Sequence, residues 1–135
     1  MSHRSRLSGV RVLVVDDARY VLDVVTDMLQ CNGANVTAVD SAEEALDILQ
    51  RERPDVLLSD IAMPGMDGYA LLRQARARLR GARVVAAALT AYAGEEDRRR
   101  ALAAGFQMHL AKPVEPAELI SVIATLIAQS SKALL

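Results

Sequence analysis

Five short apolar runs alternate along the chain with five longer segments of helical spacing. Three of the runs, at 12–15, 56–58 and 84–89, are apolar at consecutive positions rather than at alternating ones. Such runs are typical of strands covered on both faces, as in a parallel sheet. The other two runs, at 36–39 and 108–111, are less apolar but also alternate with helical segments.

The intervening segments carry helix start signals and differ in how well they can be anchored. Residues 41–44 have the pattern of a capping box, Asp67 can cap the helix that follows it, and Pro116 suits a first helical position. The helix expected at 94–104 is polar and rich in arginine, so it should be the least firmly held. Strand and helix alternating five times predict a (βα)5 chain with right-handed crossovers.

Five strands are too few to close the usual eight-stranded barrel, which leaves an open sheet with helices on both faces. We therefore predict an α/β, three-layer, flavodoxin-like fold with a five-stranded parallel sheet in the strand order 2-1-3-4-5. In that order the ligand crevice lies beyond the carboxyl ends of strands 1 and 3. We expect one domain over residues 9–129, with flexible termini at 1–8 and 130–135.

Composition argues against several classes of protein. The chain has 16 basic and 17 acidic residues and four aromatic ones, which disfavours binding of nucleic acid or anionic membrane through bulk charge or base stacking. The run Arg98–Arg100 follows Glu95–Asp97 at helical ion-pair spacing, so we interpret it as a solvated helix face. No apolar run approaches the ~20 residues of a membrane span, and residues 1–6 are no signal peptide. The lone Cys31 fits a reducing compartment, so we expect a cytoplasmic protein.

Polar residues stand at the carboxyl ends of four predicted strands: Asp16, Asp17, Asp60, Thr90 and Lys112. Three carboxylates meeting in one crevice would repel one another and raise at least one pKa unless a cation joins them. A site of oxygen ligands with open positions suits Mg²⁺, which keeps waters and takes a substrate phosphate. The set suits phosphoryl transfer, with Asp60 on the central strand as the best nucleophile and Lys112 and Thr90 as partners of the phosphoryl oxygens.

Four segments, 14–17, 57–68, 89–91 and 104–113, together resemble the receiver domain of two-component response regulators. Each segment alone is a weak signal, but all four in order and at the right spacing are specific, and the resemblance covers about residues 11–127. The stretch 105–114 looks most like receivers attached to hybrid sensor kinases.

The resemblance implies how the acidic residues act. Asp60 would accept the phosphoryl group and would also bind Mg²⁺ or Mn²⁺. Asp17 would be a direct ligand of the ion, and Asp16 would bind it directly or through water. The backbone carbonyl of Ala62 would complete the protein's share of the coordination.

The resemblance also assigns residues around the phosphoryl group. Thr90 and Lys112 would hold it, and the Lys112–Pro113 bond would be cis. His109 is a departure, because the family usually has Tyr or Phe there, whose ring follows the threonine inward on phosphorylation. His109 either takes part in this switch or is a solvated imidazole at a strand end. Tyr92 would lie over the mouth of the site and affect how long the phosphate survives.

We therefore predict a phosphorylation-activated switch of a two-component phosphorelay. A sensor histidine kinase or a histidine phosphotransfer domain would supply the phosphoryl group. The protein would not be an enzyme, but would catalyse its own phosphorylation and slow autodephosphorylation. Phosphorylation should bias the fourth helix and the face formed by strand 4, helix 4 and strand 5, through which a homodimer or an effector could dock.

Two alternatives belong to other classes. The first is a small-molecule phosphatase or phosphotransferase that forms an aspartyl-phosphate. Such enzymes commonly carry a second Asp two residues after the nucleophile, where this chain has Ala62. The second is a pseudo-receiver that only docks partners, which the presence of every acceptor residue disfavours.

Overall fold

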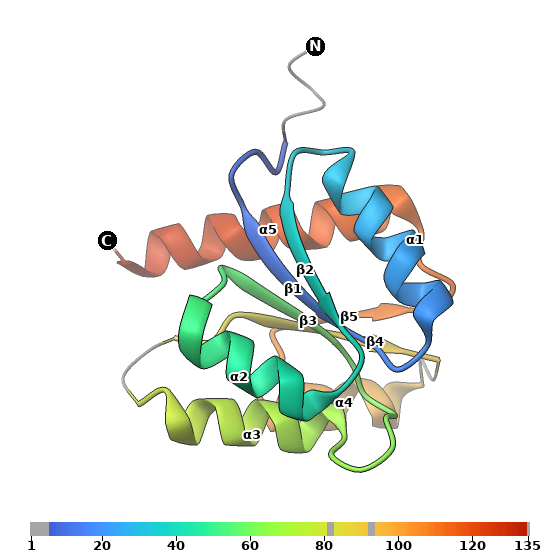
Figure 1. Cartoon of the computed structure of the whole chain (residues 1–135), viewed down its shortest axis with the longest axis vertical. Coiled ribbons are helices and arrows are strands. Elements are labelled where there is room, and N and C mark those ends of the chain that lie inside the picture. The colour runs from blue at the N-terminus through green and yellow to red at the C-terminus, as the bar shows by residue number, and fades with distance from the viewer. Residues whose placement is uncertain (1–5, 81–82, 92–93, 135) are drawn as a thin grey trace.

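Residues 6–80, 83–91 and 94–134 are described by the structure, which is a computed structural model. Over these residues the chain alternates strictly between strand and helix (Figure 1). The elements are β1 (Arg11–Val15), α1 (Arg19–Gln30), β2 (Asn35–Val39), α2 (Ala42–Glu52), β3 (Val56–Asp60), α3 (Gly68–Arg78), β4 (Ala86–Thr90), α4 (Glu95–Ala104), β5 (Met108–Ala111) and α5 (Pro116–Leu134). The strands form one sheet in the order β2-β1-β3-β4-β5, and every pairing is parallel. The predicted fold and strand order are therefore confirmed.

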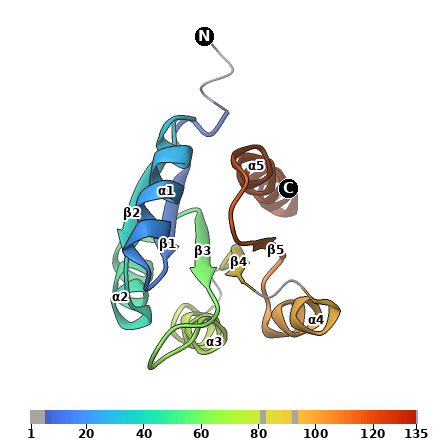
Figure 2. The ribbon, with the colours of Figure 1, turned by 90° about the vertical axis from the view of Figure 1, so that its right-hand side faces the viewer.

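Helices cover both faces of the sheet. Figures 1 and 2 show α1 and α5 on one side of the sheet and α2, α3 and α4 on the other. Neighbouring residues of one strand enter different cores: Leu57 of β3 packs toward α2 and α3, whereas Leu58 packs toward α1 and α5. This two-sided burial explains why the central strands are apolar at consecutive positions.

The strand predicted at 84–89 begins two residues later and ends one residue later, at Ala86–Thr90. Val84 and Val85 are buried but precede the strand. Val85 nevertheless accepts a backbone hydrogen bond from the Leu57 amide of β3 at 2.8 Å, so the pairing with β3 begins just before the strand itself. At the other end of the strand, Thr90 is the last residue of β4.

Two predicted caps are present, and they fix where helices begin beside the sheet. The Ser41 hydroxyl accepts a hydrogen bond from the Glu44 amide at 3.2 Å, and the Asp67 carboxylate accepts one from the Ala70 amide at 2.8 Å. At the other end of the chain, α5 continues to Leu134, so helical backbone extends into the segment predicted as a flexible terminus. Within the described parts of the chain, no helix is both long and apolar enough to cross a membrane.

The pairing register brings the carboxyl ends of the strands to one edge of the sheet. Val15 of β1 pairs with Ser59, so Asp16 and Asp60 follow the same rung of the ladder. On the other side of β3, Thr90 of β4 pairs with Ala111 of β5, and Lys112 comes next. The sheet therefore delivers residues that are far apart in sequence to one place.

Candidate functional site

Three carboxylates gather at this edge of the sheet. Asp16, Asp17 and Asp60 each offer an oxygen, and these three oxygens all lie within 4.8 Å of one another. Asp16 is fully buried, Asp60 is 4% exposed, and Asp17 is exposed to solvent. The cluster forms because β1 and β3 are neighbours in the sheet, at the point where the strand order reverses.

Lys112 supplies a positive charge to the cluster. Its Nζ lies 2.8 Å from Oδ2 of Asp16 and 3.3 Å from Oδ1 of Asp60. Burial lowers the pKa of Lys112, but the hydrogen bond to Asp16 and the charges of Asp60 and Asp16 outweigh it, so the pKa is raised overall. The Lys112–Pro113 peptide bond is cis. Because its pKa is raised, the Lys112 ammonium group is charged at neutral pH, and it lies between the carboxylates of Asp16 and Asp60.

The cluster carries more negative than positive charge, with three carboxylates against one ammonium group. Burial, followed by the charge of Asp16, raises the pKa of Asp60 from 3.8 to about 6, although Lys112 lowers it. Three carboxylates face one ammonium group, and all of their ligand atoms are hard oxygens. This donor set fits Mg²⁺ or Mn²⁺, which prefers oxygen ligands and tolerates water at its remaining positions.

A cavity of about 430 Å³ lies next to the cluster. Its walls come from the β3–α3 loop, α3, the end of β4 and α4: Ile61, Ala62, Met63, Asp67, Tyr69, Thr90, Asp97 and Arg100. Thr90 and Ala62, two of the predicted site residues, thus share one cavity. Ile61, the residue after Asp60, also lines the cavity, which therefore opens beside the cluster.

One predicted residue lies elsewhere in the structure, and another falls outside the residues it describes. His109 on β5 is half-buried and lines a separate hollow of about 360 Å³ between α4, β5 and α5, together with Arg98, Leu102 and Glu118. The structure thus separates His109 from the cavity that Thr90 lines. Tyr92 lies outside the described residues, and its place at the mouth of the site stays a prediction.

Gly68 is a residue whose importance the sequence did not reveal. Its amide donates a hydrogen bond to the Ile61 carbonyl at 2.9 Å, which folds the start of α3 back onto the end of β3. A Cβ atom at this position would collide with the carbonyl oxygen of Asp60. The pair Asp67-Gly68 reads as a turn and cap in the sequence, but the glycine is needed for this close backbone approach.

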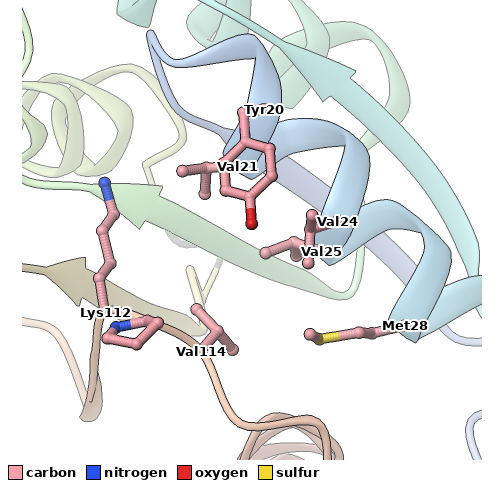
Figure 3. Close-up of a pocket in the computed structure, with 8 residues that line it drawn as sticks. Tyr20, Val21, Val24, Val25, Met28, Lys112 and Val114 are labelled. Carbon is pink, nitrogen blue, oxygen red and sulfur yellow. The ribbon is translucent and has the colours of Figure 1, made fainter.

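An apolar pocket of about 250 Å³ lies on the other side of Lys112 (Figure 3). It is lined by α1 and the β5–α5 loop: Tyr20, Val21, Val24, Val25, Met28, Lys112, Pro113 and Val114. In Figure 3 the ammonium end of Lys112 points away from Val24 and Met28. Tyr20 is 77% exposed, so this pocket opens on the surface close to the acidic cluster.

Comparison with known proteins gives one consistent family. Residues 12–124 match the response regulator receiver domain. An uncharacterized 14.6 kDa protein of Leptolyngbya boryana is 48% identical over 117 residues, which cover 87% of this chain and 89% of that protein. The response regulator protein FleR of Pseudomonas aeruginosa is 38% identical over 116 residues, but these residues span 86% of this chain and only 24% of FleR.

A solved structure agrees with the sequence matches. The CheY-like response regulator receiver domain protein of Methanospirillum hungatei superposes with a TM-score of 0.83 at 32% identity, over 93% of this chain and 99% of that one. The likeness therefore extends over nearly the whole chain.

Proposed function

Because this chain belongs to the response regulator receiver domain family, we propose that it works as a phosphorylation-activated switch with Asp60 as the phosphoacceptor. Receiver domains of response regulators act in two-component signalling and interact with histidine kinases. The observation that carries the proposal is the placement of Asp60, which is nearly buried between an acidic pair and Lys112. The family match gives no support to the alternative, a small-molecule phosphatase.

The transfer needs an ionised carboxylate and a neutralised phosphoryl group. An Asp60 oxygen forms the new bond to phosphorus while the bond from phosphorus to the imidazole nitrogen of phosphohistidine breaks, and its electron pair goes to that nitrogen. With a pKa of about 6, Asp60 is mostly ionised at neutral pH. The Lys112 ammonium would hold one phosphoryl oxygen, and the Thr90 hydroxyl would donate a hydrogen bond to another.

Receiver domains bind Mg²⁺ at an acidic pocket, and we propose that Asp16, Asp17, Asp60 and the backbone carbonyl of Ala62 are its ligands here. The ion supplies positive charge that neutralises the phosphoryl oxygens and the crowded carboxylates. Lys112 contributes a further positive charge through its contacts with Asp16 and Asp60. Mn²⁺ has the same ligand preferences and should substitute.

The phosphodonor is proposed to be a sensor histidine kinase or a histidine phosphotransfer domain. The apolar pocket between α1 and the β5–α5 loop supports a protein donor, because it opens beside Lys112 and exposes Tyr20. An apolar side chain of a donor helix seated there would bring its histidine close to Asp60. Whether the chain acts alone or as the receiver of a hybrid kinase, the same docking applies.

The output surface is proposed to be the face of β4, α4 and β5, used by an effector or by a second copy of the chain. The hollow that His109 lines is on this face, and Leu102 beside it is 52% exposed. We propose no role in binding nucleic acid. A cytoplasmic location is likewise a proposal, supported by the kinase partner and the free, exposed Cys31.

Phosphorylation can be tested by mass spectrometry of the intact protein. Incubation with Mg²⁺ and phosphoramidate, a small analogue of phosphohistidine, should add one phosphoryl group. The addition should be absent in Asp60→Asn and after chelation of the metal, but present in Asp47→Asn, which changes an exposed aspartate. No addition with phosphoramidate or with a kinase, or undiminished addition to Asp60→Asn, would contradict the proposal.

The same experiment tests slow turnover. Because Ala62 offers no carboxylate to activate water, the phosphorylated protein should lose its phosphate slowly. Rapid, Asp60-dependent release of phosphate from simple phosphate esters over many turnovers would favour the phosphatase alternative.

A further inference from the structure

Helix α4 has little apolar anchoring to the rest of the protein. Among its ten described residues, Glu95–Ala104, only Ala101 is buried. A helix with so small an apolar face gains little stability from core packing. Something other than hydrophobic burial must contribute to holding it beside α3.

The first such contact joins Arg100 of α4 to Tyr69 of α3. The guanidinium carbon of Arg100 lies 4.5 Å from the centre of the Tyr69 ring, within the range of a cation–π interaction. Tyr69 is only 6% exposed, so its ring is fixed in place. The same ring meets Phe106, two residues after α4, edge to face at a centroid distance of 6.5 Å and an interplanar angle of 72°.

The second contact holds the carboxyl end of α4. Arg76 of α3 donates a hydrogen bond from Nη2 to the carbonyl of Gly105 at 2.8 Å. Gly105 caps α4 with a φ of +112°, and a Cβ atom there would collide with the Arg76 guanidinium. A positive charge at a helix carboxyl end is also favoured by the helix dipole. Two arginines, one from each helix, thus join α3 and α4.

We propose that these contacts form a latch between α3 and α4, made by Tyr69, Arg76, Arg100 and the Gly105 carbonyl, and that it sets how firmly α4 is held before phosphorylation. Release of the latch by the phosphoryl group rests on the function proposed above. The connection is geometric, since Tyr69 and Arg100 line the same cavity as Thr90.

A phosphoryl group on Asp60 would act on α4 through two opposite charges. The phosphoryl group carries about 1.5 to 2 negative charges where the ionised Asp60 carboxylate carried one, so it adds up to about one net negative charge and extends it beside this cavity. Arg100 would be drawn from the Tyr69 ring toward the phosphoryl group, while Asp97, one helical turn earlier and on the same cavity wall, would be repelled. Both effects weaken the latch and tilt α4. Tyr69 on α3 is then the aromatic residue coupled to the site, whereas the β5 position carries His109.

Hydrogen exchange on the unphosphorylated full chain tests the latch without any phosphoryl transfer. Backbone amides of residues 98–106 should exchange about two- to fivefold faster in Arg100→Met and in Tyr69→Leu, the factor expected for loss of one cation–π contact at an exposed site. Tyr69→Phe, which keeps the ring, and Arg99→Met, which changes an exposed neighbour, should match the wild type.

Amides of β1 and β3 serve as the internal reference, because their exchange reports global unfolding. Unchanged exchange of α4 in Arg100→Met would overturn the latch. An equal acceleration in α4, β1 and β3 in that variant would also overturn it, since the effect would then be on global stability.

A second measurement tests the coupling to phosphorylation. In the wild type, phosphorylation should speed exchange in α4, and in Arg100→Met the additional increase should be smaller because the latch is already open. Equal increases in both proteins would overturn the coupling while leaving the latch itself intact. If no donor phosphorylates Asp60, the proposed function fails, yet the first measurement still decides whether the latch exists.

Discussion

Replacing Asp60 by asparagine should stabilise the metal-free protein at neutral pH. Asp60 is 4% exposed, and burial together with the charge of Asp16 raises its pKa from 3.8 to about 6. A shift of roughly two units corresponds to about 3 kcal/mol, because each unit is ~1.4 kcal/mol. Asparagine has nearly the same shape, but its buried amide needs hydrogen-bond partners of its own, so we expect a net gain of about 1–3 kcal/mol in the free energy of unfolding.

The sign of the pH dependence follows from the direction of the pKa shift. The folded protein binds the Asp60 proton more tightly than the unfolded chain does, so ionisation of Asp60 costs stability as the pH rises from 3.8 to about 6. The full cost is present above that window and absent below it. The advantage of Asp60→Asn over the wild type should therefore be largest at neutral pH and should vanish as the pH falls below the window.

Urea unfolding followed by circular dichroism, in a chelator and across this pH range, measures the difference. Added Mg²⁺ should reduce this advantage, because the ion at 100 times its Kd stabilises the wild type by about 2.7 kcal/mol. It should bind Asp60→Asn more weakly, since that site has lost one carboxylate. The control Asp47→Asn removes an exposed ion pair with Arg51 and should change stability by less than about 1 kcal/mol. The reasoning is refuted if metal-free Asp60→Asn is no more stable than the wild type at neutral pH, or if its advantage does not shrink in acid.

Three other substitutions probe the same site. Lys112→Met should destabilise the metal-free protein by about 3 kcal/mol in urea unfolding, because Asp16 stays buried without its ammonium partner. In an NMR titration of this variant, the pKa of Asp60 should lie above its wild-type value. A lower pKa would contradict the electrostatic account. Asp16→Asn should weaken Mg²⁺ binding by about tenfold or more in calorimetry, whereas unchanged affinity would remove Asp16 from the metal site. Gly68→Ala should lower the free energy of unfolding by about 1–3 kcal/mol and slow phosphorylation, because the added Cβ meets the backbone of Asp60. Gly94→Ala is the control, since a Cβ has room there, and equal effects of the two substitutions would argue against this explanation.

Local chemistry explains why much of the fold could be predicted. A strand between two helical layers must be apolar at consecutive positions, and β1 and β3 have that pattern. The weak anchoring expected of α4 is also observed, since a helix without an apolar face has nothing to bury, and only Ala101 is buried in its described length. Polar residues directly after apolar strands indicate a functional site, because the carboxyl ends of parallel strands meet at one edge of the sheet.

The contacts between segments far apart in the chain could not be predicted from the sequence. Tyr69 and Arg100 are 31 positions apart, and their stacking depends on how α3 and α4 lie against β4. The close approach of Gly68 to Asp60 depends on the path of the β3–α3 loop. His109 is the clearest case, because the resemblance left open a part in the switch or a solvated imidazole at a strand end, and the structure places it half-buried in a hollow between α4, β5 and α5.

The sequence by itself determined which residues can do chemistry and the order in which strands and helices follow one another, because these depend on side-chain type and local periodicity. Only the tertiary structure decided how strongly those residues perturb one another. The raised pKa of Asp60 requires its burial beside Asp16, and the charge on Lys112 acts because its Nζ lies between the two carboxylates. Burial and charge separation are properties of packed neighbours, so they appear only once the sheet has brought the strand ends together.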